Sequence, residues 1–219
     1  MTADARLLDR ARAVDTTSLA DAGRTLRVLP PAIRPVRPGL RMLGRAVTAR
    51  ANADLMSVIA ALQQAGPGDV LVVDAGSDDR AVAGELFATE ALRRGVAGLV
   101  VDGLVRDTAT LARLDLPVYA RGAAPHAVGA ARLPEVQWPV VIGGVEVRPG
   151  DLVVGDDDGV LVLTEAELAD AIDGAEQIQR REVGLQADVA AGTSLFDRFD
   201  FDDHLARLRA GQPSRLSFA

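Results

Sequence analysis

The sequence predicts an α/β protein with a central, partly parallel sheet, an antiparallel second layer and C-terminal helices. Two apolar runs, 69–74 and 97–102, are each followed by a helical pattern, and consecutive strand–helix units form parallel sheets. Four short strand patterns then follow at close spacing, separated by turn residues, which is typical of antiparallel strands. At 219 residues the chain can bury a core without disulfides, and we expect a single domain over 1–219.

The N-terminal segment predicts two short helices followed by an extended crossing. Apolar residues recur at helical spacing over 4–14, and a second helix is expected over 17–23, with Thr16 or Thr17 as its N-cap. The prolines that follow keep the chain extended, because proline lacks the backbone N–H that a helix needs. The alternating pattern of 45–50 predicts the first long strand.

The remaining elements follow from apolar periodicity and from the glycines that end the helices. Helices are expected at 54–65, 83–94 and 107–114, and strands at 69–74, 97–102, 117–120, 139–142, 145–147, 152–155 and 160–163. Gly143-Gly144 and Asp158-Gly159 supply turns. Thr164 with Glu167 three residues later forms a capping box, which starts C-terminal helices that extend from about 164 to 210.

Two residue types are missing from the sequence, and each absence excludes a class of chemistry. The chain has no cysteine, which excludes disulfides, thiolate nucleophiles and cysteine-ligated metal sites. All 24 basic residues are arginines, so no lysine is present to form a Schiff base or to complete a P-loop. Carbonyl chemistry in this protein must therefore depend on a metal ion or on arginine.

Charge and hydropathy limit which partners the protein can bind and where in the cell we expect it. A formal net charge of −7 argues against a nucleic-acid groove, since phosphate binding needs a basic surface. No run approaches the roughly 18 apolar residues of a membrane span, and the charged N-terminal stretch is unlike a secretory signal. We therefore expect no membrane association and a cytoplasmic location.

Two loops should share the edge of the sheet where parallel strands end, which is where ligands bind in such sheets. The first loop, 75–85, leads into a helix whose first backbone N–H groups are free. Gly84, Glu85, Leu86 and Phe87 could hold a carboxylate or phosphate through these amides. The alternative is that Gly84 only allows close packing between helix and sheet.

The second loop contains Arg106 and Asp107. Arginine binds a carboxylate with two parallel N–H groups, and an aspartate oxygen is a suitable ligand for Mg²⁺ or Mn²⁺. The alternative is that Asp107 caps the next helix and pairs with Arg106. Asp102 ends its strand at the same edge, where it could hydrogen-bond a water ligand of such a metal or serve in a turn.

Several spaced motifs resemble the RraA-like family of divalent-metal-dependent aldolases and ribonuclease regulators. They are GPGDVLVVDAG at 66–76, GELFATEALRRGVAGLVVDGLVRD at 84–107, PVYARG at 117–122 and GGVEVRPGDLVVGDDDGVLVL at 143–163. The resemblance implies a swivelling ββα-type fold. It also implies a homotrimer or hexamer whose active sites lie between subunits.

The resemblance also implies roles for single residues. The backbone of Gly84, Glu85, Leu86 and Phe87 would bind the carboxylate of a pyruvyl group, Arg106 would bind the pyruvyl group, and Asp107 would ligate Mg²⁺ or Mn²⁺. Glu182 would reach the site of a neighbouring subunit. From the chemistry of the reaction, a metal-bound water held by Asp102 or by Glu182 could relay the proton. The aldolases usually carry an acid three residues after this aspartate, where this chain has Thr110.

The resemblance therefore predicts a lyase that releases pyruvate. Its substrates would be 2-oxo diacids of the 4-hydroxy-4-methyl-2-oxoglutarate type, cleaved by a retro-aldol reaction, and oxaloacetate, which would be decarboxylated. Either reaction forms a pyruvate enolate, whose charge needs a metal ion and Arg106 in a protein without lysine. The alternatives are a regulator that binds an RNA-processing enzyme without catalysis, and a family member without present activity.

Overall fold

The computed structural model describes residues 5–23, 25–76 and 79–217. Position 4 of the first expected helix and positions 77–78 of the first expected site loop lie outside the described residues. The chain divides into two compact units, Met1–Ala175 and Glu176–Ala219, and the helix α6 (Glu165–Ala190) runs through the boundary. The single domain over 1–219 stays a prediction. No helix among the described residues is both long and apolar enough to cross a membrane.

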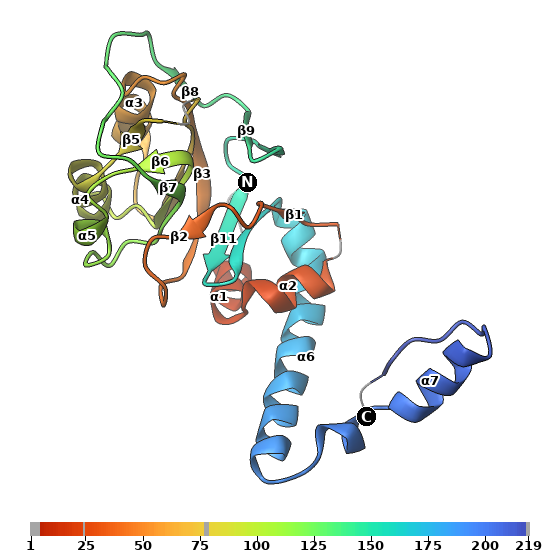
Figure 1. Cartoon of the computed structure of the whole chain (residues 1–219). Coiled ribbons are helices and arrows are strands. Elements are labelled where there is room, and N and C mark those ends of the chain that lie inside the picture. Colours follow the sequence, from red (N-terminus) through yellow and green to blue (C-terminus); the bar gives the residue numbers. More distant parts are fainter. Residues whose placement is uncertain (1–4, 24, 77–78, 218–219) are drawn as a thin grey trace. The chain divides into compact units, whose positions relative to one another are not determined.

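The first unit is built around a mixed sheet (Figure 1). Its strand order is β1-β12-β11-β3-β4-β6-β7-β2, with β5 beside β6 and β8 beside β3. The strands are β1 (Arg27–Val28), β2 (Arg34–Pro35), β3 (Met42–Arg50), β4 (Asp69–Asp74), β5 (Ala81–Ala83), β6 (Gly98–Val105), β7 (Val118–Ala123), β8 (Glu135–Val136), β9 (Val140–Ile142), β10 (Val145–Val147), β11 (Leu152–Asp156) and β12 (Gly159–Leu163). The helices are α1 (Ala5–Ala13), α2 (Thr16–Ala22), α3 (Met56–Gln64), α4 (Glu85–Arg93), α5 (Thr108–Leu111), α6, the 3₁₀ helix η1 (Leu195–Arg198) and α7 (Phe201–Arg209).

The parallel part of the sheet is confirmed. β3, β4, β6 and β7 pair side by side in the same direction, with Arg50 opposite Asp74 and Asp74 opposite Asp102. Both faces of these strands are covered, which explains why their sequences are continuous apolar runs. On one face the core packs under α3, α4 and α5, and on the other it packs against the β9–β10 hairpin (Figure 1).

The antiparallel strands are arranged in two ways. β9 and β10 form a separate hairpin closed by Gly143 and Gly144, whose φ angles of 56° and 89° suit glycine. β11 and β12 also form a hairpin, but β11 pairs antiparallel with β3 and so extends the main sheet. The mixed α/β class with C-terminal helices is confirmed.

Two local predictions were wrong. The N-cap of α2 is Asp15, whose carboxylate accepts a hydrogen bond from the Ser18 N–H at 2.7 Å, rather than Thr16 or Thr17. Thr16 instead donates its hydroxyl to the buried Asp156. The helix expected from 83 begins at Glu85, because the buried apolar residues before it form strand β5 beside β6.

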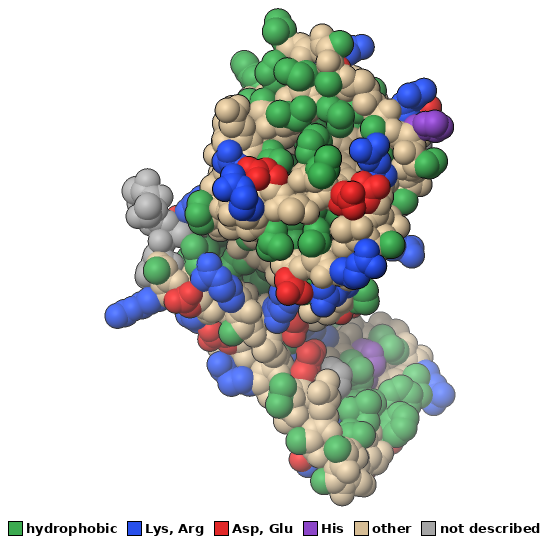
Figure 2. Space-filling model, turned by 90° about the vertical axis from the view of Figure 1, so that its left-hand side faces the viewer, with side chains coloured by type: hydrophobic (Ala, Val, Ile, Leu, Met, Phe, Trp, Pro, Cys, Tyr) green, Lys and Arg blue, Asp and Glu red, His purple; other side chains and the backbone are tan. Residues whose placement is uncertain are grey.

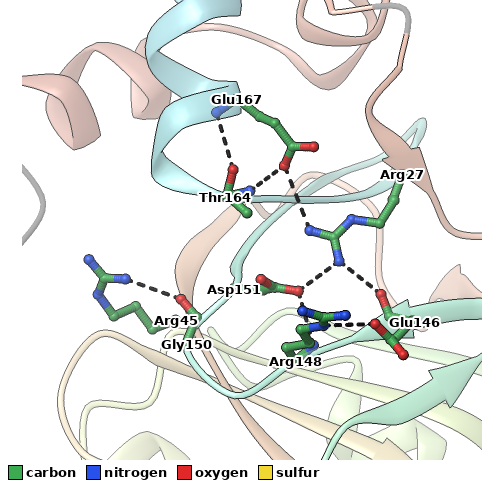
Figure 3. Close-up of polar contacts among 8 residues, drawn as sticks. All are labelled: Arg27, Arg45, Glu146, Arg148, Gly150, Asp151, Thr164 and Glu167. Carbon is green, nitrogen blue, oxygen red and sulfur yellow. Dashed lines mark hydrogen bonds and ion pairs between the residues drawn. The ribbon is translucent and has the colours of Figure 1, made fainter.

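An arginine, Arg27, joins three parts of the first unit near the start of α6 (Figure 3). Its Nη1 donates to Asp151 Oδ2 at 2.8 Å and to the Glu146 carbonyl at 2.9 Å, and its Nη2 lies 3.7 Å from Glu167 Oε2. The predicted capping box is confirmed: the Thr164 N–H donates to Glu167 at 2.6 Å, and the Glu167 N–H donates to the Thr164 hydroxyl at 3.2 Å. Arg27 therefore ties β1 to the turn before β11 and to the first turn of α6.

We expect Arg27→Ala to lower the free energy of unfolding by about 1–3 kcal/mol, because the side chain of Asp151, only 8% exposed, loses its cation. Arg148→Ala is the matched control: its pair with Glu146 has side chains 67% and 51% exposed, so the change should have little effect on stability. Urea denaturation of both variants measures the difference. Equal costs would contradict the assigned role of Arg27.

Candidate active site

Strand β5 brings the two predicted site loops together. It pairs parallel with the end of β6, and the Arg106 N–H donates to the Ala83 carbonyl at 3.0 Å. The residue after β5 is Gly84, so the start of α4 lies directly beside Arg106 and Asp107. The described residues of the two loops therefore lie at one edge of the sheet, as expected.

The carboxylate of Asp107 points away from the helix that follows it. It makes no capping hydrogen bond to α5; instead Oδ2 accepts a hydrogen bond from the Glu85 N–H, at the start of α4, at 3.2 Å. The same oxygen lies 3.4 Å from Arg106 Nε. The backbone of Asp107 has φ 59° and ψ 36°, a left-handed conformation that costs energy in a non-glycine residue and is concentrated at functional sites.

Gly84 is surrounded by the two charged residues of the site. A Cβ atom at this position would lie 2.6 Å from Asp107 Oδ2 and 2.9 Å from Arg106 Cγ. Any larger residue would therefore displace the two charged side chains. The atoms that require a glycine here belong to the polar site rather than to helix–sheet packing, which was the alternative for this residue.

A pocket of about 260 Å³ opens beside these residues. It is lined by Leu55, Ile59, Ala81, Val82, Ala83, Gly84, Leu86, Phe87, Arg106, Asp107 and Ala127. Leu86, at the edge of the pocket, is 72% exposed. Figure 2 views the side of the first unit on which α4 and α5 lie, and shows hydrophobic side chains gathered between acidic and basic groups. The pocket suits a small ligand with one charged end.

The residues present fit a divalent cation that is shared with a ligand. Within the described residues no group of three or more acidic or histidine side chains could enclose a metal ion alone. Mg²⁺, however, is commonly held by one or two carboxylates together with waters and substrate oxygens. Asp107, with a side chain 34% exposed at the pocket, can supply that one carboxylate.

The structure does not join Asp102 to this arrangement by any hydrogen bond or ion pair among the described residues. One of its oxygens is paired with Arg121 Nε, and the other accepts a hydrogen bond from the Gly143 N–H at 2.6 Å. Asp102 thus ties β6 to β7 and to the turn of the β9–β10 hairpin. A role in proton transfer stays a prediction, and these contacts favour a positioning role.

Three more charged residues lie on neighbouring strands near Asp102, and sequence analysis missed them. Arg50 and Asp74 lie opposite each other at the ends of β3 and β4, and Asp74 lies opposite Asp102. Arg121 lies within β7, and Asp102 lies within β6, which continues to Val105 instead of ending at Asp102 as expected. Burial raises the pKa of Asp74, the Gly76 N–H lowers it, Asp102 raises it and Arg50 lowers it, with a net increase. Each of the three missed residues ends or directly follows an apolar run in the sequence, which was the available signal.

Glu182 lies in the second unit, Glu176–Ala219. It is exposed on α6 and borders a hollow of about 510 Å³ together with Arg181, Leu185, Gln186, Val189, Ala190 and Leu195.

Thr110 stands at the position where the resemblance leads us to expect an acid. It lies in α5, and its N–H donates to the Asp107 carbonyl at 2.9 Å.

Comparisons with known proteins agree on one family. A family model described as RraA-like (Aldolase/RraA) matches residues 5–162. A Halalkalibacterium halodurans protein named "Putative 4-hydroxy-4-methyl-2-oxoglutarate aldolase" is 36% identical over 170 residues, covering 77% of this chain and 81% of its own. An uncharacterized protein from Pseudomonas syringae superposes with a TM-score of 0.78 at 29% identity, covering 90% and 98% of the two chains. The RNA-processing inhibitor RraA from Thermus thermophilis gives 0.64 at 36% identity, covering 68% and 92%.

We expect Asp74→Asn to raise stability at neutral pH. Because the folded-state pKa of Asp74 is raised, the folded protein binds its proton more tightly than the unfolded chain does. Asp74 therefore makes stability fall as pH rises from about 4 through the raised pKa. Thermal unfolding between pH 4 and 8 should show a smaller fall in the variant, with Asp115→Asn, at an exposed carboxylate, as control. A lower melting temperature for Asp74→Asn at pH 7 would contradict this account.

Proposed function

The chain belongs to the RraA-like family, and we propose that it is a divalent-metal-dependent lyase that releases pyruvate from 2-oxo acids. The observation that carries the proposal is the position of Arg106 and Asp107 against the N-terminus of α4, at the edge of a pocket. The expected reactions are aldol cleavage of 4-hydroxy-2-oxo diacids, of which 4-hydroxy-4-methyl-2-oxoglutarate is the example in the relatives' names, and decarboxylation of oxaloacetate.

The absence of lysine limits how the reaction can be catalysed. Breaking the C3–C4 bond leaves an electron pair on the pyruvyl fragment, and no Schiff base can accept it in this chain. A divalent cation, Mg²⁺ or Mn²⁺, supplies Lewis-acid stabilisation of this charge when bound. Asp107 would hold the cation, since its carboxylate is a hard oxygen ligand that faces the pocket.

The remaining groups bind and orient the pyruvyl end. The first backbone N–H groups of α4, at Glu85, Leu86 and Phe87, precede the first hydrogen-bonded turn of the helix and suit a carboxylate. That of Glu85 donates to Asp107 in the structure. Gly84 leaves room for the Asp107 carboxylate and the Arg106 side chain to lie beside this backbone. Arg106 adds a fixed positive charge beside the carbon that becomes negative, where a charge present before the reaction is most effective.

Proton transfer completes the reaction. In aldol cleavage a base removes the C4 hydroxyl proton, the C3–C4 bond breaks to give a carbonyl product, and C3 of the enolate takes up a proton. We propose a homotrimer or hexamer in which Glu182 of another copy supplies the base. Asp102, held by Arg121 and the Gly143 N–H, would position the strands around the site.

A regulatory function is the second candidate, and one comparison favours it. The Thermus protein at 36% identity is described as an RNA-processing inhibitor. We propose as the alternative that this chain binds an RNA-processing enzyme through its surface, without turnover of 2-oxo acids. Such binding should be unaffected by EDTA and by substitution of Asp107, which separates the two functions.

We expect Asp107→Asn to lower metal-dependent pyruvate release by at least about 100-fold, because the neutral amide is a poor cation ligand of the same shape. The measurement couples pyruvate to lactate dehydrogenase, with 4-hydroxy-4-methyl-2-oxoglutarate, oxaloacetate or a 4-hydroxy-2-oxo monoacid as substrate, with Mg²⁺ and with EDTA. Asp115→Asn, an exposed carboxylate paired with Arg37, is the control and should keep full activity. Full activity in EDTA or in Asp107→Asn would contradict the proposal.

We also expect Gly84→Ala to lower kcat/KM at least tenfold, since the added methyl group would displace Asp107 and Arg106. Circular dichroism and thermal unfolding should show that the variant keeps its fold. Gly122→Ala, where the added Cβ would meet its nearest neighbour at an ordinary 3.4 Å, is the matched control. Unchanged activity in Gly84→Ala would remove Gly84 from the site.

A further inference from the structure

The segment 124–134, which joins β7 to β8, borders the pocket but has few apolar anchors (Figure 1). Ala127 lines the pocket, and Val128 is the one residue of the segment that is buried. The position of the segment therefore depends mainly on hydrogen bonds. These bonds connect it to strand β5 on one side and to the start of α3 on the other.

The contact with β5 is a short parallel bridge. The Ala81 N–H donates to the His126 carbonyl at 2.8 Å, and the Val128 N–H donates to the Ala81 carbonyl at 3.1 Å. β5 therefore lies between this segment and the end of β6, beyond which the Arg106 N–H donates to the Ala83 carbonyl at 3.0 Å. A displacement of the segment would reach the candidate site through the three residues of β5.

The carboxylate of Asp54 fixes the other side of the segment. Asp54 is only 4% exposed, and its Oδ2 accepts hydrogen bonds from the Ala131 N–H at 2.7 Å and the Arg132 N–H at 3.2 Å. Its Oδ1 accepts a hydrogen bond from the Met56 N–H, at the start of α3, at 2.9 Å. Asp54 therefore holds α3 and the segment, two parts of the pocket wall, in one arrangement.

The negative charge of Asp54 strengthens these contacts. Hydrogen bonds from Met56 and Ala131 lower the pKa of Asp54, burial raises it and Arg132 lowers it, with a net decrease, so the carboxylate is ionised at neutral pH. Hydrogen bonds from N–H groups to an ionised carboxylate are stronger than those between neutral groups. An asparagine offers one acceptor oxygen, so it can serve the donor of α3 or those of the segment, but not both.

We propose that Asp54 is a positioning residue for the lyase site. It holds the segment 124–134 against β5 and α3, and β5 in turn places Gly84 and Arg106 at the charged end of the pocket. All of these contacts lie within one chain, so each copy of an oligomer carries them. The inference rests on the proposed function and adds to it a residue that does not itself line the pocket.

Asp54→Asn should lower kcat/KM for metal-dependent pyruvate release from 4-hydroxy-4-methyl-2-oxoglutarate by at least about tenfold, because a small displacement of the charged groups is costly for the reaction. Metal-dependent exchange of the methyl protons of pyruvate in D₂O, followed by NMR, should fall by a similar factor, since it needs only the pyruvyl end of the site. Amide hydrogen exchange should become faster at Ala81 and Val128.

Asp156→Asn is the matched control for a purely structural role. Asp156 is 7% exposed, and its carboxylate also accepts three hydrogen bonds, from the Thr16 N–H, the Thr16 hydroxyl and the Asp158 N–H. It ends β11 beside the start of β3, whereas the pocket lies where the parallel strands end. Asp156→Asn should therefore lower the melting temperature but leave kcat/KM within about twofold of the unsubstituted protein.

Ala131→Pro tests the same contact from the other side, because proline has no N–H to donate to Asp54 and Ala131 is exposed. It should lower kcat/KM at least about threefold, and it replaces Asp54→Asn as the test if that variant does not fold. Circular dichroism and thermal unfolding establish which variants are folded.

The outcomes separate this inference from the proposed function. Unchanged kcat/KM in a folded variant, or unchanged amide exchange at Ala81 and Val128, would overturn the role of Asp54 and leave the lyase function in place. An equal loss of kcat/KM in Asp156→Asn would also overturn it, since the effect would then follow stability alone. Absence of pyruvate release and of methyl-proton exchange in the unsubstituted protein would overturn the proposed function and the inference with it.

Discussion

The candidate site depends on one local arrangement, in which the carboxylate of Asp107 accepts a hydrogen bond from the first backbone N–H of α4. Strand β5 creates this arrangement, since its pairing with β6 places Gly84 beside Arg106. Glycine is required there because a Cβ atom would overlap with Asp107. The left-handed backbone of Asp107 then directs its carboxylate away from its own helix and toward α4. Sheet pairing, a small residue and a strained backbone thus act together to keep two charges at the pocket.

The charges at the site determine which ligands and intermediates it can stabilise. The chain is acidic overall and contains no lysine, so its positive charge at the site comes from Arg106 and from the helix N-terminus. The fold holds the helix N-terminus in place before a ligand arrives, which is the condition for stabilising a developing enolate effectively, and Arg106 lies beside it, 3.4 Å from Asp107. Asp102 joins β6 to Arg121 on β7 and to the turn of the β9–β10 hairpin, and Arg50 and Asp74 lie opposite each other at the ends of β3 and β4.

Most of the fold could be predicted, because buried parallel strands have unmistakable apolar runs and the capping box at Thr164 is specific. Strand β5 could not be predicted, because its three small apolar residues fit a strand or a helix equally well. Only the pairing with β6 decides between the two. Arg106 and Asp107 were predicted from their position after a strand, and Gly84 from its position near the start of a helix. Arg121 was missed because its partner, Asp102, is on another strand, and the sequence does not show which strands are neighbours.

Manganese binding is the most direct test of a cation site at Asp107. In the proposed site, Asp107 and a bound 2-oxo acid share one divalent cation, so the cation and the acid should bind cooperatively. Electron paramagnetic resonance of Mn²⁺, titrated with and without oxalate as a mimic of the pyruvate enolate, measures this. We predict that oxalate tightens Mn²⁺ binding at least tenfold and that Asp107→Asn removes the effect. Mn²⁺ affinity that is the same with and without oxalate would contradict the account.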